Sequence, residues 1–168
     1  MKVYKNFLNK KDFKIIEEHM LGANFPWYYN KNVVGKYENG LVEDEKNFQF
    51  THCFYQNDKI NSNQFEIILS IIKMINPFTI LRIKANLLTR TPKNIEHGYH
   101  TDFDKNSHKV TTGVFYLNTN DGYTRFKNKT VVKSEANKYV EFEGIESHTG
   151  STCTDKNIRV VINFNYIK

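Results

Sequence analysis

Few residues in this sequence interrupt or cross-link the chain. Its 168 residues include three prolines, eight glycines and two cysteines. Cys53 and Cys153 lie far apart and neither belongs to a CxxC pair, so reduced thiols are a better expectation than a disulfide framework. No linker rich in Ser, Gly or Pro and no internal repeat divides the sequence. One domain spanning residues 1–168 is therefore expected.

Long apolar runs are also missing. No stretch approaches the roughly 18 consecutive apolar residues that a transmembrane helix needs. Residues 1–6 lack the apolar core of a secretory signal. We therefore expect a cytoplasmic protein without a membrane partner, located in the host cytoplasm if its source is viral. Hydrophobic residues make up 39% of the chain and aromatic residues 14%, which favours a folded core over disorder.

The charge balance is basic but not concentrated. Lysine and arginine number 24 against 18 acidic residues, which gives a formal charge of +6. The nearest approach to a basic cluster is formed by Lys127, Lys129 and Lys133. A solvated, lysine-rich surface accounts for this pattern, and nucleic-acid binding through a basic patch stays open as the alternative.

Helical periodicity appears only in the first half of the sequence. Residues 9–21 repeat apolar side chains on one face and start at Asn9, a good N-cap residue. A second helix is expected over 62–75, with Ser62 or Asn63 as its cap. These helices and their supporting strands would occupy residues 1–78.

Strand patterns dominate the remaining sequence. Residues 46–56 alternate, whereas 22–42 are rich in glycine and asparagine and are expected to be largely loop. From residue 79 onward, alternating stretches separated by turns cover residues 79–88, 110–117, 139–142 and 158–167. Short strands at this spacing predict a β-sandwich or barrel over 79–168, so the fold should be mainly β with N-terminal helices.

Two histidines and one aspartate form the most informative pattern. His100 and Asp102 are two residues apart and would share one face of an extended segment, and His148 follows far downstream. Two imidazoles and one carboxylate are the ligands of the facial triad on non-haem Fe(II), which leaves positions open for a co-substrate and O2. Zinc is a rival metal because it accepts the same ligand types.

Other histidines compete for the metal. His97 lies three residues before His100, but Gly98 and the missing i,i+4 spacing argue against a helical zinc motif, so we interpret His97 as a loop residue. The remaining candidates have ordinary interpretations as a helix-terminal, a packed strand and a solvated loop histidine: His19, His52 and His108.

Several motifs follow one another in a recognisable order. They are His100-Thr101-Asp102, Thr112 to Asn118, Gly122-Tyr123-Thr124-Arg125-Phe126, His148, Arg159 and Asn163. In this order they resemble Fe(II)/2-oxoglutarate-dependent dioxygenases over roughly residues 79–167, most of all prolyl-hydroxylase-like members and the small versions of bacteriophages. The resemblance implies a double-stranded β-helix, which is a jelly-roll, cupin-like fold with a metal in its mouth.

The resemblance also implies roles for individual residues. His100, Asp102 and His148 would bind Fe(II), and no catalytic residue is expected beyond these ligands. Arg159 would pair with the distal carboxylate of 2-oxoglutarate, in keeping with the bidentate fit of guanidinium to carboxylate. Four further residues would contribute to the co-substrate pocket: Tyr116, Thr112, Asn163 and Asn86.

Two positions depart from the family's pattern. Tyr123 stands where relatives commonly have a small or acidic residue. Leu88 lies near the position where many relatives carry a tyrosine that contacts 2-oxoglutarate, and leucine cannot donate a hydrogen bond. The keto-acid end of the co-substrate is therefore expected to be held in another way.

The resemblance implies that the protein consumes Fe(II)-bound 2-oxoglutarate and O2, with ascorbate as a supporting reductant, to hydroxylate a C–H bond. A peptide or protein side chain such as proline is the favoured substrate, and the aromatic run 25–29 and Arg125 are candidates to line its groove. Two alternatives stay open. One is a nucleic-acid demethylase that stacks a base on Trp27 or Tyr28, and the other is a non-catalytic viral jelly-roll module. The sequence leaves the oligomeric state open.

Overall fold

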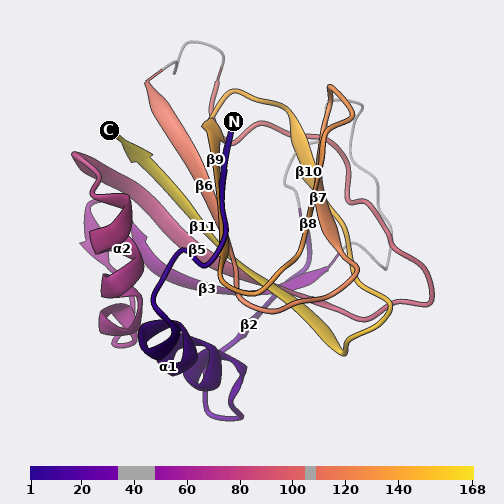
Figure 1. Ribbon diagram of the computed structural model, residues 1–168, viewed down its shortest axis with the longest axis horizontal. Helices are drawn as coiled ribbons and strands as arrows, with labels where there is room; N and C mark the ends of the chain where they lie inside the picture. Colours follow the sequence, from indigo (N-terminus) through magenta and orange to yellow (C-terminus); the bar gives the residue numbers. More distant parts are fainter. Residues whose placement is uncertain (34–47, 105–108) are drawn as a thin grey trace.

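The computed structural model describes residues 1–33, 48–104 and 109–168. Two antiparallel β-sheets face each other, and helices α1 and α2 cover the outer face of the larger sheet (Figure 1). The mainly β part of the fold prediction is therefore confirmed. Neither helix in the described residues is long and apolar enough to cross a membrane.

The larger sheet carries the longest strands, in the order β1-β9-β6-β11-β5-β3-β2, with β4 paired to β3. Its centre is β11, which pairs with β5 on one side and with β6 on the other. The bounds are β1 Lys2–Tyr4, β2 Tyr28–Asn30, β3 Gln49–Gln56, β4 Lys59–Ile60, β5 Thr79–Thr89, β6 Val110–Tyr116, β9 Lys138–Glu143 and β11 Ile158–Ile167. The inner faces of β5 and β11 form the floor on which the candidate site is built.

The smaller sheet has the order β10-β7-β8, with β7 (Tyr123–Phe126) between β8 (Val131–Lys133) and β10 (His148–Gly150). The segment that follows β5 runs beside β10 and makes two isolated β-bridges. His100 pairs with His148 of β10, and Glu96 pairs with Ser151, the residue directly after β10. The chain between β5 and β6 is thus held against the smaller sheet.

Local sequence explains how the helices start and stop. Helix α1 (Lys10–Leu21) corresponds to the predicted helix, and the Asn9 side chain accepts a hydrogen bond from the Asp12 amide. The expected single helix over 62–75 is instead a 3-10 turn, η1 (Phe65–Ile68), followed by α2 (Leu69–Ile75). Ser62 is engaged in a turn before η1, because its hydroxyl accepts from the Gln64 amide.

The predicted long strands agree with β5, β6, β9 and β11 to within one residue at each end. The short strands β1, β2, β4, β7, β8 and β10 were not predicted, and β7 comprises most of the Gly122–Phe126 motif. Residues 34–42 of the predicted loop, 46–47 of the predicted strand, and His108 lie outside the described residues.

The two faces of β11 separate an apolar core from a polar pocket. Val160, Ile162 and Phe164 face the core that α1 and α2 cover. On the opposite face, Val161 belongs to a smaller apolar cluster between the sheets. Arg159 and Asn163, four residues apart on the same face, line a cavity. The polar side chains on this face therefore lie at a cavity rather than in the apolar core.

The buried His52 gives the fold a pH dependence that can be tested. Its Nδ1 lies 2.7 Å from the Pro26 carbonyl oxygen and its Nε2 lies 2.7 Å from the Ser62 hydroxyl. Burial lowers the pKa of His52 despite the hydrogen bond to Pro26. Because the unfolded chain then takes up a proton more readily, the free energy of unfolding should fall as the pH drops below about 6.5.

Replacing His52 by glutamine should weaken that dependence. We expect the thermal midpoint of His52→Gln to change less between pH 7 and pH 5, about the range in which a free histidine titrates, than that of the unmodified protein. Differential scanning fluorimetry across this range measures the difference. An identical pH profile in both proteins would contradict the account.

Candidate metal centre and co-substrate pocket

The three predicted metal ligands are brought together. His100 and His148 exchange backbone hydrogen bonds of 2.9 Å in both directions, which places their rings side by side with centroids 4.6 Å apart. Asp102 follows two residues after His100, and the candidate ligand atoms of all three residues lie within 4.8 Å of one another. An ion with ligand bonds of about 2.0–2.2 Å can contact all three after small side-chain adjustments.

Backbone carbonyl groups orient both imidazoles. The Nδ1 atom of His148 lies 3.0 Å from the Glu146 carbonyl oxygen, and that of His100 lies 3.5 Å from the Gly98 carbonyl oxygen. A proton on each Nδ1 leaves the Nε2 lone pair free for a metal. The ring of Phe142, whose centroid is 4.8 Å from that of His148, packs against this ligand.

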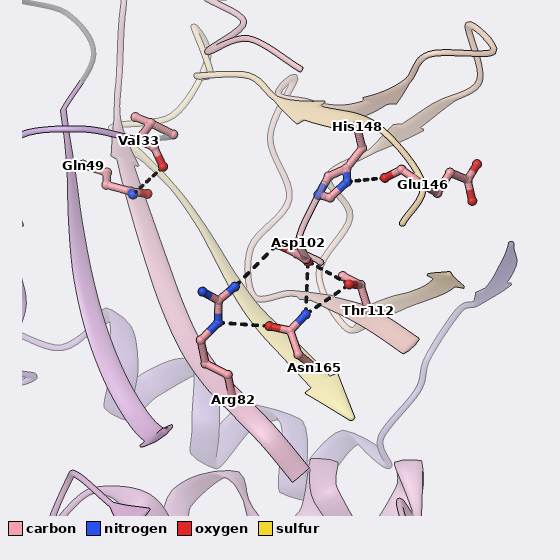
Figure 2. A network of polar contacts seen from close by, with 8 residues as sticks. All are labelled: Val33, Gln49, Arg82, Asp102, Thr112, Glu146, His148 and Asn165. Carbon is pink, nitrogen blue, oxygen red and sulfur yellow. Dashed lines mark hydrogen bonds and ion pairs between the residues drawn. The ribbon is translucent and has the colours of Figure 1, made fainter. Parts of the chain in front are cut away.

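Side chains from three strands hold the Asp102 carboxylate (Figure 2). The Thr112 hydroxyl on β6 donates to Oδ2 at 2.7 Å, and the Asn165 amide on β11 donates to the same oxygen at 3.1 Å. Arg82 on β5 approaches Oδ1 at 3.4 Å and also donates from Nε to the Asn165 side-chain oxygen at 3.0 Å. Asp102 is thus fixed at the junction of β5, β6 and β11.

The protonation states of the ligands suit a metal. Burial, followed by the neighbouring His148, lowers the pKa of His100 to about 4, so this imidazole is neutral near pH 7. Burial opposes ionisation of Asp102, but the neighbouring His148, Arg82 and the Thr112 hydroxyl hold its pKa below the usual value. Metal binding therefore need not displace a proton from either group.

Arg159 places an uncompensated cation at the other end of the pocket. Its side chain is only 3% exposed. Nε donates to the Ser134 hydroxyl at 2.8 Å and Nη2 donates to the Thr124 hydroxyl at 3.3 Å. Burial lowers the pKa of Arg159, and within the described ranges no Asp or Glu carboxylate forms an ion pair with it. A buried guanidinium of this kind needs an anion.

The turn before β7 leaves room for the Arg159 stem. A side chain at Gly122 would place its Cβ 2.6 Å from the Cδ atom of Arg159 and 2.9 Å from the Thr152 carbonyl oxygen. Glycine is therefore required at this position by packing. The glycine of the Gly-Tyr-Thr-Arg-Phe motif thus serves the arginine that lies far downstream in the sequence.

The predicted pocket residues divide into two groups. One cavity of about 340 Å³ is lined by the three predicted metal ligands, Arg159, Asn163 and Asn86, together with Leu88. Tyr116 and Thr112 are buried behind the cavity wall rather than in it: Tyr116 donates to the Thr124 hydroxyl at 2.8 Å, and Thr112 donates to Asp102. Their hydroxyl groups thus support residues that do line the cavity.

Sequence reasoning did not single out Thr124, Arg82 or Asn165. Thr124 accepts hydrogen bonds from Tyr116 and Arg159 and lines the cavity. Its signal was its place within the Gly122–Phe126 motif, whereas the signal for Asn165 was its position on the same strand face as Asn163. Only the register of β5 against β11, which pairs Arg82 with Asn165, brings Arg82 into the network.

The cavity also contains an unsatisfied polar atom. The side-chain oxygen of Asn86 is buried and has no hydrogen-bond partner in the described structure. Leu88, two residues further along β5, offers only an apolar surface at the position where relatives commonly have a tyrosine. Arg159, which lacks a carboxylate partner among the described residues, and the clustered donor set fit a pocket built for a metal and a dicarboxylate. The free oxygen of Asn86 can accept a hydrogen bond but cannot bind a carboxylate, which offers no donor.

The aromatic run proposed for substrate binding lies elsewhere. Phe25 belongs to the core and Trp27 packs against that core, while Tyr28 and Tyr29 are exposed on the edge strand β2. Arg125 pairs with Glu96 at 2.8 Å. None of these residues is among those that line the cavity.

The Thr112 hydroxyl should tune metal affinity through Asp102. Thr112→Val keeps the shape of the side chain but removes the 2.7 Å hydrogen bond. Loss of such an outer contact commonly weakens metal binding about 10-fold or more, and we expect at least this effect in a competition titration with a chelating dye. Thr111→Val is the matched control, because the neighbouring side chain points to the other face of β6. Equal affinity in both variants would contradict this role.

Comparisons with known proteins identify solved structures that share this fold. No protein-family model matches the sequence, and no curated protein sequence matches it. A prolyl hydroxylase from Trichoplax adhaerens, solved with a hypoxia inducible factor peptide fragment, aligns with a TM-score of 0.66 at 12% identity and covers 99% of this chain and 82% of its own. A 2OG-Fe(II) oxygenase family oxidoreductase from Burkholderia pseudomallei aligns with a TM-score of 0.65 at 13% identity, over 97% and 82%.

An enzyme of another reaction type shares the same architecture. The non-heme alpha ketoglutarate dependent epimerase SnoN from nogalamycin biosynthesis aligns with a TM-score of 0.61 at 12% identity, over 99% of this chain and 75% of its own. The three proteins agree in fold, although one is a prolyl hydroxylase and another an epimerase. The chain therefore has the fold of the prolyl hydroxylases and other 2OG-Fe(II) oxygenases.

Proposed function

We propose that this protein is an Fe(II)- and 2-oxoglutarate-dependent dioxygenase that hydroxylates a C–H bond. One observation carries the proposal: His100, Asp102 and His148 face the same cavity as the buried, unpaired guanidinium of Arg159. The donor set suits Fe(II) and leaves coordination positions open, and the arginine suits a dicarboxylate that extends from the metal. The two facing sheets would form the double-stranded β-helix that surrounds this site.

The protein's own residues would bind and position the reactants. The bound metal and co-substrate would supply the oxidising chemistry, in which 2-oxoglutarate, O2 and the substrate C–H group are converted to succinate, CO2 and the hydroxylated substrate. Arg159 would bind the distal carboxylate, with Thr124 and Asn163 as hydrogen-bonding neighbours. Leu88 and Val161 would exclude water from the middle of the pocket.

The substrate is proposed to be a peptide or protein side chain such as proline. Support comes from the shared fold with a prolyl hydroxylase that was solved with a peptide fragment bound. The role of the aromatic run 25–29 in substrate binding finds no support among the cavity-lining residues, so the specificity must be sought in the cavity itself.

Succinate formation tests the proposal. Purified protein is incubated with Fe(II), ascorbate, O2 and 2-oxoglutarate, with and without a panel of prolyl peptides, and succinate is measured. We expect succinate above the level of a no-iron control, and a mass increase of one oxygen on the substrate. Replacement of Fe(II) by Zn(II) should leave no turnover. A protein that neither binds Fe(II) nor forms succinate would be the non-catalytic module instead.

A further inference from the structure

The candidate pocket contains more positive charge than the metal and co-substrate require. Arg82, Lys84 and Arg159 all line it, and Asp102 is the one carboxylate among its described lining residues. Bound Fe(II) and a 2-oxoglutarate dianion would cancel each other's charge. The loaded pocket would therefore keep two positive charges, and a cleft lined by charges of one sign attracts a further anion.

Lys84 is the cation without an assigned partner. It lies on β5 opposite Asn163 of β11 and is only partly exposed. Asp102 lies close enough to favour its charged form, yet within the described residues no carboxylate forms an ion pair with Lys84. Burial lowers the pKa of Lys84, and the charge of the nearby Arg82 lowers it further.

The register of β5 against β11 separates Lys84 from Arg159, the residue proposed to bind the co-substrate. Arg159 stands opposite Leu88, whereas Lys84 stands four residues earlier on β5, about 13 Å along the strand. Arg82, the next inward residue, stands opposite Asn165 and contacts Asp102. The cations therefore lie at two ends of the pocket floor, with Arg159 at one end and Lys84 with Arg82 at the metal end.

We propose that the substrate carries a carboxylate close to the carbon that is oxidised, and that Lys84, assisted by the partly exposed Arg82, binds this carboxylate. The inference rests on the proposed function and adds the substrate class to it. For a proline substrate, the carboxylate is either an acidic side chain beside the target residue or the α-carboxylate of the free amino acid. Both sources present the same chemistry to Lys84.

Two pairs of probes separate these sources, because the members of each pair differ in charge but hardly in shape. One pair is acetyl-Pro-Asp-amide and acetyl-Pro-Asn-amide, and the other is L-proline and L-prolinamide. Binding is measured by calorimetry without O2, on protein loaded with Fe(II) and 2-oxoglutarate. We expect the acidic member of at least one pair to bind about 10-fold more tightly than its neutral partner, and this preference to shrink as salt is added.

Substitutions at Lys84 test whether this side chain is responsible. Lys84→Met keeps most of the apolar stem and should reduce the preference to about 2-fold or less, while Lys84→Arg should retain it. Lys133→Met, at an exposed position on β8, is the matched control and should behave like the unmodified protein. Thermal midpoints of all variants verify that each one is folded.

The outcomes distinguish this inference from the proposed function. If the unmodified protein fails to bind 2-oxoglutarate in the presence of Fe(II), the proposed function itself is wrong. If it binds 2-oxoglutarate but shows no preference for a carboxylate in either pair, the substrate inference alone is overturned. The inference is also overturned if Lys84→Met weakens 2-oxoglutarate binding as strongly as a substitution of Arg159, because Lys84 would then serve the co-substrate.

Discussion

Replacing Asp102 by alanine should abolish Fe(II) binding and all 2-oxoglutarate turnover. Asp102 would supply the negative ligand of the proposed triad, and its carboxylate contacts Thr112, Asn165 and Arg82. Without it the metal would face two imidazoles and a nearby guanidinium, so we expect affinity for Fe(II) to fall by at least about 100-fold. Metal content after dialysis and succinate formation measure the two effects.

Two further variants serve as controls for this test. Asp102→Asn retains the approximate shape of the side chain but loses its charge, and it should lose the metal as well, which separates a binding defect from a folding defect. Asp104→Ala removes an exposed carboxylate from the same loop and should leave metal content unchanged. Retention of a full equivalent of iron by Asp102→Ala would contradict the assignment of the triad.

Replacing Arg159 by methionine should remove 2-oxoglutarate binding while leaving the metal in place. The guanidinium is buried, donates to Ser134 and Thr124, and has no carboxylate partner in the described structure. Loss of a charge-assisted, bidentate contact in a buried site costs about 2–4 kcal/mol, which corresponds to roughly 30- to 1,000-fold in affinity. The stabilisation that 2-oxoglutarate gives to the metal-loaded protein should vanish with it.

The co-substrate defect of this variant must be separated from general loss of charge. Arg90→Met removes an exposed arginine that directly follows β5 and should bind 2-oxoglutarate like the unmodified protein. Both variants should bind Fe(II) equally. The role of Arg159 would be refuted if Arg159→Met and Arg90→Met had the same dissociation constant for 2-oxoglutarate.

The sequence was most informative where a pattern is local and repeated. The alternation predicted β5 and β11 to within a residue at each end, and Arg159, Val161 and Asn163, which alternate along β11, all line the cavity. The i,i+2 spacing likewise predicted that His100 and Asp102 could meet one ion. These features depend on strand geometry alone, which a single sequence carries.

Other features depend on long-range pairing and were not predictable. Strands such as β1 and β10 are three residues long and form only because a partner strand is available. The contact of Arg82 with Asp102 requires the register of β5 against β11 and the path of a separate loop. In the same way, the Tyr116 hydroxyl was expected to reach the co-substrate, but its nearest partner is Thr124 of the opposite sheet.

The central claim is that one cavity binds Fe(II) through three ligands and a dicarboxylate through Arg159. An anaerobic titration, in which Fe(II) and 2-oxoglutarate are added while the visible spectrum is recorded, tests it most directly. We expect a weak charge-transfer band that appears only when both are present, is absent in Asp102→Ala, and needs far more 2-oxoglutarate in Arg159→Met. The claim would be contradicted if folded, unmodified protein gave no band at saturating Fe(II) and 2-oxoglutarate.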